Sequence, residues 1–298
     1  MLTIANLTKD YPTVRALDRL SLEVPAGEVF GLLGPNGAGK TTALRIVMRI
    51  IAPTSGEVRF NGPPISRGDL DRVGYLPEER GLYRNSVSRD AAIYFAELKG
   101  LSSAQAAKNV DRDFERFGMG EIAEKKIGEL SKGNQQKVQI VAALAHDPDL
   151  VILDEPFSGF DPVNQETILE LTRELAAKGR AILVSTHQME LAEELCDRIA
   201  LLNRGDVALR GTPSELRRQG KATRVRLRLA DPAERPDFPD AAEVETLDDE
   251  FRITLKPGVE PSAFIRAVSA TRDVIEFAES APTLRRVFLD AVKGGDDE

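Results

Sequence analysis

Cysteine and histidine are scarce in this sequence of 298 residues, and each scarcity argues against a class of site. The one cysteine, Cys196, rules out an internal disulfide framework and a cysteine-rich zinc site. The two histidines lie far apart in the sequence, which disfavours a histidine-based metal site. No apolar run approaches the roughly 18–20 residues of a membrane-spanning helix. The start of the sequence also lacks the basic residues and apolar stretch of a signal peptide. We therefore expect a globular chain that does not itself cross a membrane.

Acidic residues outnumber basic ones, and the formal net charge is -8. This balance argues against a general nucleic-acid-binding protein, because phosphate backbones attract basic surfaces. The excess of acidic residues is concentrated in residues 222–298, which contain 17 acidic and 11 basic residues. We expect a domain boundary near residues 220–222, which gives domains over residues 1–220 and 221–298.

The order of strands and helices predicts an α/β fold for the first domain and an α+β fold for the second. A helical region over about 85–146 forms a subdomain within the first domain. Outside this subdomain, the expected strands of the first domain cover residues 20–24, 29–33, 151–153 and 181–185. The expected helices there cover residues 41–51, 165–178 and 189–196. In the second domain we expect strands over 224–229 and 251–255, and helices over 261–270 and 283–292.

A glycine-rich segment lies between the apolar strand 29–33 and the helix that starts near residue 41. It consists of Gly34, Pro35, Asn36, Gly37, Ala38, Gly39, Lys40, Thr41 and Thr42 and fits the pattern G-x-x-x-x-G-K-[ST] in full. Glycines let backbone N–H groups wrap phosphate oxygens, and the following helix adds the positive end of its dipole. Lys40 is expected to contact the β- and γ-phosphates, and the Thr41 hydroxyl to bind Mg²⁺. The segment predicts a nucleotide-phosphate site.

Two carboxylates, Asp154 and Glu155, end the apolar strand 151–153. In phosphate-loop enzymes an acid at the end of a neighbouring strand reaches the Mg²⁺, and Asp154 suits that role. The side chain of Glu155 is expected to point away from the Mg²⁺, to a place where a carboxylate can orient or deprotonate the attacking water. Alone, the pair could equally be two solvated acids, but the glycine-rich segment upstream favours hydrolysis.

Residues 130–137, with the sequence LSKGNQQK, resemble the LSGGQ signature of ATP-binding cassette (ABC) proteins. Lys132 and Asn134 depart from that signature, whereas Ser131 and Gly133 are kept. The resemblance implies an α/β phosphate-loop ATPase core with a mixed sheet and a helical subdomain. It also implies that Ser131 and Gly133 cap the γ-phosphate held by a partner subunit.

Other residues fall at positions of the same family. The resemblance assigns Tyr11 to stacking on adenine, residues 158–162 to the loop along the dimer seam, and His187 to contact with the γ-phosphate. A lone tyrosine is otherwise a core or turn residue, and a lone histidine after a strand is otherwise structural. We expect His146 to be an ordinary helix-end residue and Cys196 to be part of the core.

Glu78 occupies the position where many ABC ATPases carry a glutamine that contacts Mg²⁺ and the attacking water. A carboxylate can still bind metal-bound water, but it adds a negative charge near the phosphates. The surrounding string LPEERGLY (residues 76–83) and the string LSKGNQQK together resemble ATPase subunits of bacterial sodium-efflux and drug exporters. Members of this subgroup carry a small C-terminal domain of accessory or regulatory type, as expected for residues 221–298.

The resemblance implies an ATP-hydrolysing subunit of a bacterial ABC transporter, with ATP and Mg²⁺ as ligands. Such a subunit lies on the cytoplasmic face of the membrane, forms a homodimer or a heterodimer with a homologous ATPase, and powers separate transmembrane subunits. Tyr83, Tyr94 and Phe95 are candidate contacts for those subunits, or ordinary core of the helical subdomain. The transported substrate is not encoded in this chain.

Two alternatives compete with a transporter. Soluble ABC ATPases of DNA repair need a long coiled-coil insert, for which there is no room between Gly39 and Leu130, and translation-linked members usually carry two cassettes. An iron–sulfur assembly ATPase would not need the C-terminal domain. A nucleotide-responsive regulator without hydrolysis is disfavoured by the intact set of Lys40, Asp154, Glu155 and His187.

Overall fold

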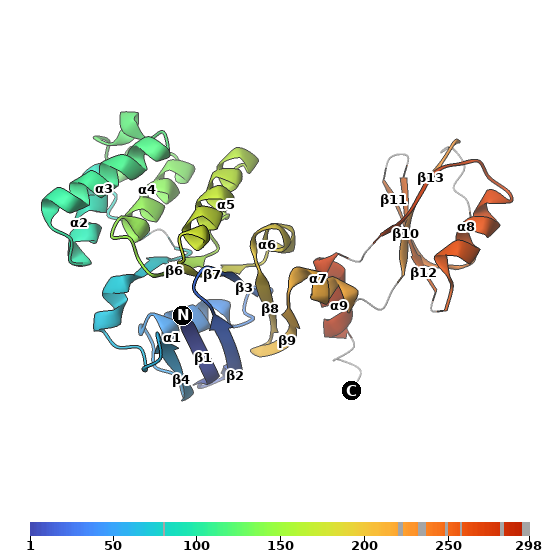
Figure 1. Cartoon of the computed structure of the whole chain (residues 1–298), viewed down its shortest axis with the longest axis horizontal. Coiled ribbons are helices and arrows are strands. Elements are labelled where there is room, and N and C mark those ends of the chain that lie inside the picture. The colour runs from blue at the N-terminus through green and yellow to red at the C-terminus, as the bar shows by residue number, and fades with distance from the viewer. Residues whose placement is uncertain are drawn as a thin grey trace. The chain divides into compact units, whose positions relative to one another are not determined.

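A computed structural model describes residues 1–79, 81–219, 223–231, 237–247, 250–256, 258–280 and 283–293 (Figure 1). The chain divides into two compact units, Met1–Arg210 and Gly211–Glu298. This division precedes the boundary predicted near 220–222, because α7 (Pro213–Arg218) packs against α9 (Leu284–Lys293) of the second unit. Leu216 of α7 is fully buried there.

A six-stranded sheet forms the centre of the first unit, with strand order β5-β6-β7-β3-β8-β9. The strands are β3 (Val29–Leu33), β5 (Val73–Leu76), β6 (Leu150–Asp154), β7 (Ala181–Thr186), β8 (Arg198–Asn203) and β9 (Asp206–Gly211). Neighbours from β5 to β8 pair in parallel. Strands β3, β6 and β7 are buried along their whole length, as expected for a parallel sheet covered on both faces. The carboxyl ends of these three strands therefore meet at one edge.

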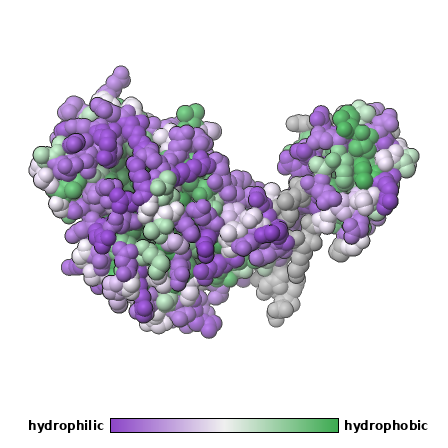
Figure 2. All heavy atoms as spheres, in the orientation of Figure 1, coloured by the Kyte–Doolittle hydropathy of each residue, from purple (hydrophilic) through white to green (hydrophobic). Residues whose placement is uncertain are grey.

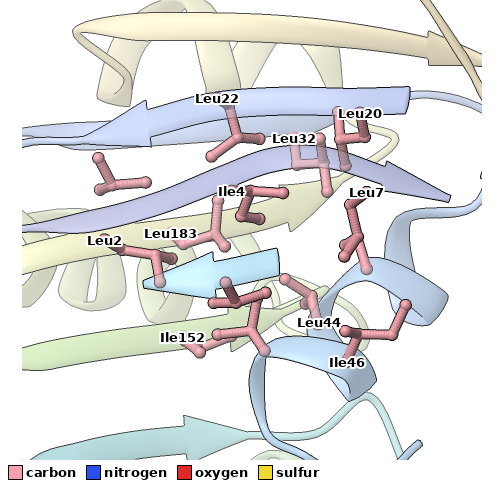
Figure 3. Close-up of a cluster of buried hydrophobic side chains, with 14 of the residues drawn as sticks. Leu2, Ile4, Leu7, Leu20, Leu22, Leu32, Leu44, Ile46, Ile152 and Leu183 are labelled. Atoms are coloured by element: carbon pink, nitrogen blue, oxygen red, sulfur yellow. The ribbon is translucent and has the colours of Figure 1, made fainter. Parts of the chain in front are cut away.

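A second, antiparallel sheet has the order β2-β1-β4. Its strands are β1 (Leu2–Tyr11), β2 (Val14–Val24) and β4 (Ser55–Phe60). Figure 3 shows leucine and isoleucine side chains of β1 and β2 beside those of β3, β6, β7 and α1 (Lys40–Val47) in one core, to which β4 adds Val58 and Phe60. Leu2 and Ile4 of β1 lie in this core with Leu44 of α1 and Leu183 of β7. Burying these side chains fixes α1 against the parallel sheet.

Three helices of the first unit pack on one another and form the predicted helical subdomain (Figure 1). They are α2 (Ser88–Leu98), α3 (Ser103–Arg116) and α4 (Lys132–Leu144). The unit also contains α5 (Pro162–Ala177), α6 (Met189–Leu195) and the short 3₁₀ helices Gly68–Arg72, Gly120–Ile122 and Ile127–Glu129. The prediction that the first helix extends to residue 51 is wrong. It ends at Val47, because Arg49 turns into the left-handed region (φ 55°) and its guanidinium binds the Ile65 carbonyl.

The second unit contains a four-stranded antiparallel sheet with the order β11-β12-β10-β13. Its strands are β10 (Arg224–Leu229), β11 (Ala241–Leu247), β12 (Glu250–Leu255) and β13 (Val274–Ser280). Alternate residues of β10 are buried, and they pack with Phe251 of β12 and Phe264 of α8 (Pro261–Ser269). The unit has the predicted α+β character.

Hydrophilic residues cover most of the face of the first unit that is drawn in Figure 2. Among the described residues, no helix has both the length and the apolar character that a membrane crossing requires. The apolar residues lie mainly inside, in the core described above.

Candidate active site

The glycine-rich segment runs from the end of β3 to the start of α1, as the sequence predicts. Gly34 (φ 151°) and Gly39 (φ 108°) have backbone conformations that favour glycine. A Cβ on Gly34 would clash with the Leu202 carbonyl oxygen, and a Cβ on Gly39 with that of Ala16. Glycine is therefore required at both positions by conformation and by close packing. Between them, Pro35, Asn36 and Gly37 are exposed and Ala38 is buried; Thr42 follows in α1 and is half-buried.

Lys40, the first residue of α1, folds back into this segment. Its side chain is buried, and Nζ donates hydrogen bonds to the carbonyl oxygens of Gly34 (2.7 Å) and Pro35 (3.3 Å). Nζ also lies 3.4 Å from Oε1 of Glu155. The ammonium group is thus held between the glycine-rich loop and the acid that follows β6, where it can neutralise phosphate oxygens.

Asp154, the last residue of β6, is only 1% exposed. Its Oδ1 accepts a hydrogen bond from the Ser185 hydroxyl, whereas Oδ2 is buried without a hydrogen-bond partner. Burial raises the pKa of Asp154 above its usual value, the hydroxyls of Ser185 and Thr41 oppose that rise, and the negative charge of Glu78 adds to it. An unpaired buried carboxylate oxygen is costly unless a cation or donor reaches it.

The oxygen atoms at this point suit Mg²⁺ bound together with phosphates. The Thr41 hydroxyl acts on the Asp154 carboxylate, so a hydroxyl and a carboxylate oxygen converge. Within the described ranges, no group of three or more His, Cys, Asp and Glu residues could hold a metal ion. Mg²⁺ typically takes one or two protein oxygens and completes its shell with substrate phosphates and water. The residues present therefore fit that cation, with the phosphates supplying the other ligands.

Glu155 lies between Lys40 and His187 and contacts both. Its backbone is in the left-handed region (φ 50°), which is rare for a residue with a side chain and is typical of functional sites. Oε2 lies 3.0 Å from Nδ1 of His187, which follows β7, and Oε1 faces Lys40. Glu155 is buried, whereas the His187 side chain is half-exposed. A carboxylate held in this way can orient a water molecule or accept its proton.

Glu78 is exposed and lies in the loop that follows β5. Its charge acts on Asp154, so the structure places it near the oxygens that suit Mg²⁺. Gln139 of α4 holds this loop by donating hydrogen bonds from Nε2 to the carbonyl oxygens of Glu79 (3.1 Å) and Pro77 (3.5 Å). The loop is thus tied to the helix that begins after Ser131.

Ser131 and Gly133 open α4. The Ser131 hydroxyl caps the helix by accepting a hydrogen bond from the backbone N–H of Asn134 (3.3 Å). A Cβ on Gly133 would lie at ordinary contact distance from the Phe160 ring, so Gly133 borders the loop that follows Glu155. In the described part of the chain, no hydrogen bond or ion pair joins either of these two residues to Lys40.

Tyr11 ends β1 and pairs with Val14 across a turn. Its side chain is 40% exposed, and the Lys9 ammonium lies 5.3 Å from the ring centroid. The same hairpin brings the Ala16 carbonyl against Gly39, so Tyr11 belongs to an element that borders the glycine-rich loop. An exposed aromatic ring at such a place can stack on a planar base.

The two residues that we expected to be structural lie apart from this cluster. Cys196 is buried with its sulfur against Gly31, which confirms its place in the core, and burial raises the pKa of the thiol. His146 follows α4 and is buried. Burial and the positive charge of Lys99 lower the pKa of His146 to about 4.

Ser185 is a residue of this site that sequence reasoning missed. It touches both acids, since its hydroxyl binds Asp154 and its carbonyl accepts the Glu155 N–H. A small polar residue directly after the apolar run Ala181–Val184 was the signal that could have pointed to it.

Comparisons with known proteins agree with this geometry. A family model described as ABC transporter matches residues 17–158. A second model, described as ATP-binding protein DrrA1-3-like, C-terminal domain, matches residues 211–292. An uncharacterized ABC transporter ATP-binding protein of Bacillus subtilis is 44% identical over 218 residues, which cover 73% of each chain. The Nod factor export ATP-binding protein I of Paraburkholderia xenovorans is 40% identical over 70% of this chain and 69% of that protein.

Solved structures show the same fold. An ATP-binding subunit of an ABC transporter is 32% identical with a TM-score of 0.68, over 74% of this chain and 92% of that one. An ATP-binding cassette solved as a dimer in a post-hydrolysis state with ADP and Pi is 26% identical, with a TM-score of 0.66 over 71% and 98%. The chain therefore belongs to the ABC transporter family, as one of its ATP-binding, ATP-hydrolysing proteins.

Proposed function

We propose that this chain is the ATP-hydrolysing subunit of an exporter, in which two ATPase subunits enclose ATP and Mg²⁺ and drive a separate membrane-spanning partner. The observation that carries the proposal is the position of Glu155. One carboxylate oxygen faces Lys40 and the other faces His187, so a single acid links the phosphate loop to the end of β7.

In the proposed reaction, each residue acts from its observed position. Lys40 binds the β- and γ-phosphates, and Glu155 accepts a proton from the attacking water. His187 holds the Glu155 carboxylate and contacts the γ-phosphate. Asp154 and Thr41 would hold Mg²⁺, with Glu78 beside them, and the ion would neutralise charge on the phosphates.

A second ATPase subunit is proposed to complete each site. Ser131 and Gly133 lie at a helix N-terminus, which favours anions, and among the described residues no hydrogen bond links them to the Lys40 loop. Binding to the γ-phosphate of a second subunit gives these residues a ligand. The dimeric cassette described above supports this arrangement. Tyr11 is proposed to stack on the adenine, and the second subunit is either another copy or a homologous ATPase.

Export is supported by the relative named for Nod factor export. The helical subdomain and the loop before it offer a surface for the membrane partner, since Tyr94 of α2 is 52% exposed and Tyr83 of that loop is 70% exposed. The Phe95 ring packs edge-on against Tyr94, which stiffens this surface. We place the chain at the cytoplasmic face of the membrane, bound through these aromatic residues.

Hydrolysis is tested by Glu155→Gln, which keeps the shape of the side chain and removes its charge. We expect the Mg²⁺-dependent rate of phosphate release to fall about 10³-fold, in the range of a lost general base. Glu170→Gln is the matched control, because Glu170 is an exposed carboxylate of α5. It should hydrolyse ATP at the normal rate. A Glu155→Gln chain as active as the control would show that the assignment of the base is wrong.

The membrane partner is tested by co-expression with candidate transmembrane subunits and purification from the membrane. We expect the chain to co-purify, and a Tyr83→Ser/Tyr94→Ser variant to lose that association while it still hydrolyses ATP. A chain that stays in the soluble fraction beside every candidate would contradict the transporter assignment and favour a soluble ABC ATPase.

A further inference from the structure

Ser185 lies on β7 at the point where β7 runs beside the end of β6. In this parallel pair Ser185 is in register with Asp154, so the two side chains are neighbours on one face of the sheet. Ser185 is fully buried, in a strand whose other residues from Ala181 to Val184 are apolar. A hydroxyl in such surroundings is costly unless it is hydrogen-bonded, which directs attention to its partners.

The partners of Ser185 are both acids of the site. Its hydroxyl donates a hydrogen bond to Oδ1 of Asp154. The backbone N–H of Glu155 donates to the Ser185 carbonyl oxygen (3.0 Å) and lies 3.3 Å from the hydroxyl oxygen. One residue of a neighbouring strand thus holds the side chain of the first acid and the backbone of the second.

These contacts determine what each acid presents to the site. Because Oδ1 of Asp154 is occupied, the carboxylate cannot rotate freely and Oδ2 is the oxygen left without a partner. The Glu155 N–H is held by the same residue, which fixes the peptide group between the two acids, and the Glu155 side chain lies between Lys40 and His187. Partners behind a metal ligand commonly fix its orientation in this manner.

We infer that Ser185 is a positioning residue for ATP hydrolysis, which aims Oδ2 of Asp154 at Mg²⁺ and anchors the backbone N–H of Glu155 beside it. The inference rests on the proposed function, since it assigns Asp154 to Mg²⁺ and Glu155 to the attacking water. The hydroxyl is the essential group, because Ser185→Ala removes only one oxygen atom from a packed site and Ser185→Thr retains the donor.

The test compares Ser185→Ala and Ser185→Thr with the unaltered chain by titrating Mg²⁺ at saturating ATP. We expect Ser185→Ala to raise the half-saturating Mg²⁺ concentration about 10-fold and to lower the maximal rate about 10-fold, the smaller end of effects seen for such partners. Ser185→Thr should stay within about threefold of the unaltered chain in both quantities, because it restores the donor. Thr172→Val is the matched control, since its buried hydroxyl bonds to the Ile168 carbonyl within α5.

Nucleotide binding gives a second measurement that does not depend on turnover. A fluorescent ATP analogue is titrated with EDTA and then with Mg²⁺. We expect Ser185→Ala to bind the metal-free analogue like the unaltered chain and to lose most of the gain in affinity that Mg²⁺ provides. If Ser185→Ala does not fold, Ser185→Cys replaces it, because a thiol is a weaker donor of similar size, and the same losses are expected in part.

The outcomes separate the inference from the proposed function. If the unaltered chain shows no Mg²⁺-dependent hydrolysis, the proposed function fails. If it does hydrolyse ATP, the inference is overturned by a Ser185→Ala or Ser185→Cys chain with an unchanged Mg²⁺ titration. It is also overturned if the variant loses metal-free binding to the same extent as Mg²⁺-supported binding, which would indicate general structural damage.

Discussion

Two regions differ in how their residues are held in place. One is the acid cluster at the end of β6, formed by Asp154 and Glu155 with Lys40 and His187, and the other is the N-terminus of α4. In the acid cluster, Lys40, Glu155 and His187 are tied to one another by contacts of 3.0 to 3.4 Å, and the two acids are buried. At the start of α4, Ser131 is exposed and its hydroxyl caps its own helix. The first region is held together by contacts within one chain, whereas the second is a helix N-terminus with no acidic residue in its own first turn.

This difference indicates which step each region carries out in the proposed dimer. A preorganised cluster can hold phosphates and a water molecule without rearrangement, which is what electrostatic catalysis requires. A helix N-terminus whose first serine caps its own helix can bind and release a ligand that comes from another subunit. Hydrolysis would then control whether the two subunits stay together.

Gly133→Asp is expected to have the largest effect of the variants that test this difference between the two regions. A Cβ there would be at ordinary contact distance from Phe160, and an acid in the first turn favours the helix, so the chain should fold at least as stably. The carboxylate would repel the γ-phosphate of a second subunit. We expect hydrolysis to fall about 10²-fold, as for the loss of a group that stabilises developing charge. ATP hydrolysis and the ATP affinity of the isolated chain are the two measurements.

Gly133→Ala is the control for this variant, because it adds the Cβ without the charge. We expect it to hydrolyse ATP close to the normal rate. If Gly133→Asp keeps full activity, or if it weakens ATP binding by the isolated chain, α4 does not act on a second subunit.

A second prediction separates stability from chemistry through His146, which lies outside both regions. Its pKa, lowered to about 4 mainly by burial, is below the value of 6.5 expected when unfolded. As the pH falls from 6.5 toward 4, the unfolded chain binds a proton at His146 while the folded chain still does not. The contribution of His146 to the free energy of unfolding is therefore fully present above pH 6.5 and declines toward pH 4. We expect His146 to account for about 2 kcal/mol of lost unfolding free energy between pH 7 and pH 5.

Urea unfolding at pH 7 and pH 5 measures this effect. His146→Gln should show a smaller decline than the unaltered chain, and the difference between the two chains isolates His146 from the carboxylates that also titrate. Equal declines would mean that His146 is not buried in its neutral form.

The smallest effect is expected for Glu78→Gln, which restores the residue usual in the family. Glu78 is exposed, so water and salt screen its charge and we expect the rate of hydrolysis to change less than about 10-fold. The rate and its Mg²⁺ dependence should be compared with those of Glu155→Gln. A loss as large as that of Glu155→Gln would move Glu78 into the catalytic group.

Local pattern predicted much of the acid cluster. The strand, glycine-rich loop and helix around Lys40 are contiguous in the sequence, and the turn at Gly34 and Gly39 demands glycine, so residue type alone located them. The acids after β6 were found for the same reason. The helix over 162–177 starts earlier than predicted, because Asp161 caps it and Pro162 suits its first position.

Contacts between distant segments could not be predicted in this way. Ser185 meets Asp154 only because β7 lies beside β6 in that register, and strand order is a property of the whole sheet. The left-handed backbone of Glu155, whose N–H bonds to the Ser185 carbonyl of β7, likewise has no signature in the local sequence. The missed strand β11 is exposed along most of its length, so it lacks the alternation of apolar residues by which strands are recognised.

The most direct test of the account mixes two inactive chains, Glu155→Gln and Gly133→Asp. If sites form between subunits, a mixed dimer contains one site that combines the intact acid cluster of one chain with the intact α4 of the other. Random pairing then restores about one quarter of normal hydrolysis, since half of the dimers are mixed and each has one sound site. A mixture no more active than its separate components would contradict the claim that the two regions act across a dimer.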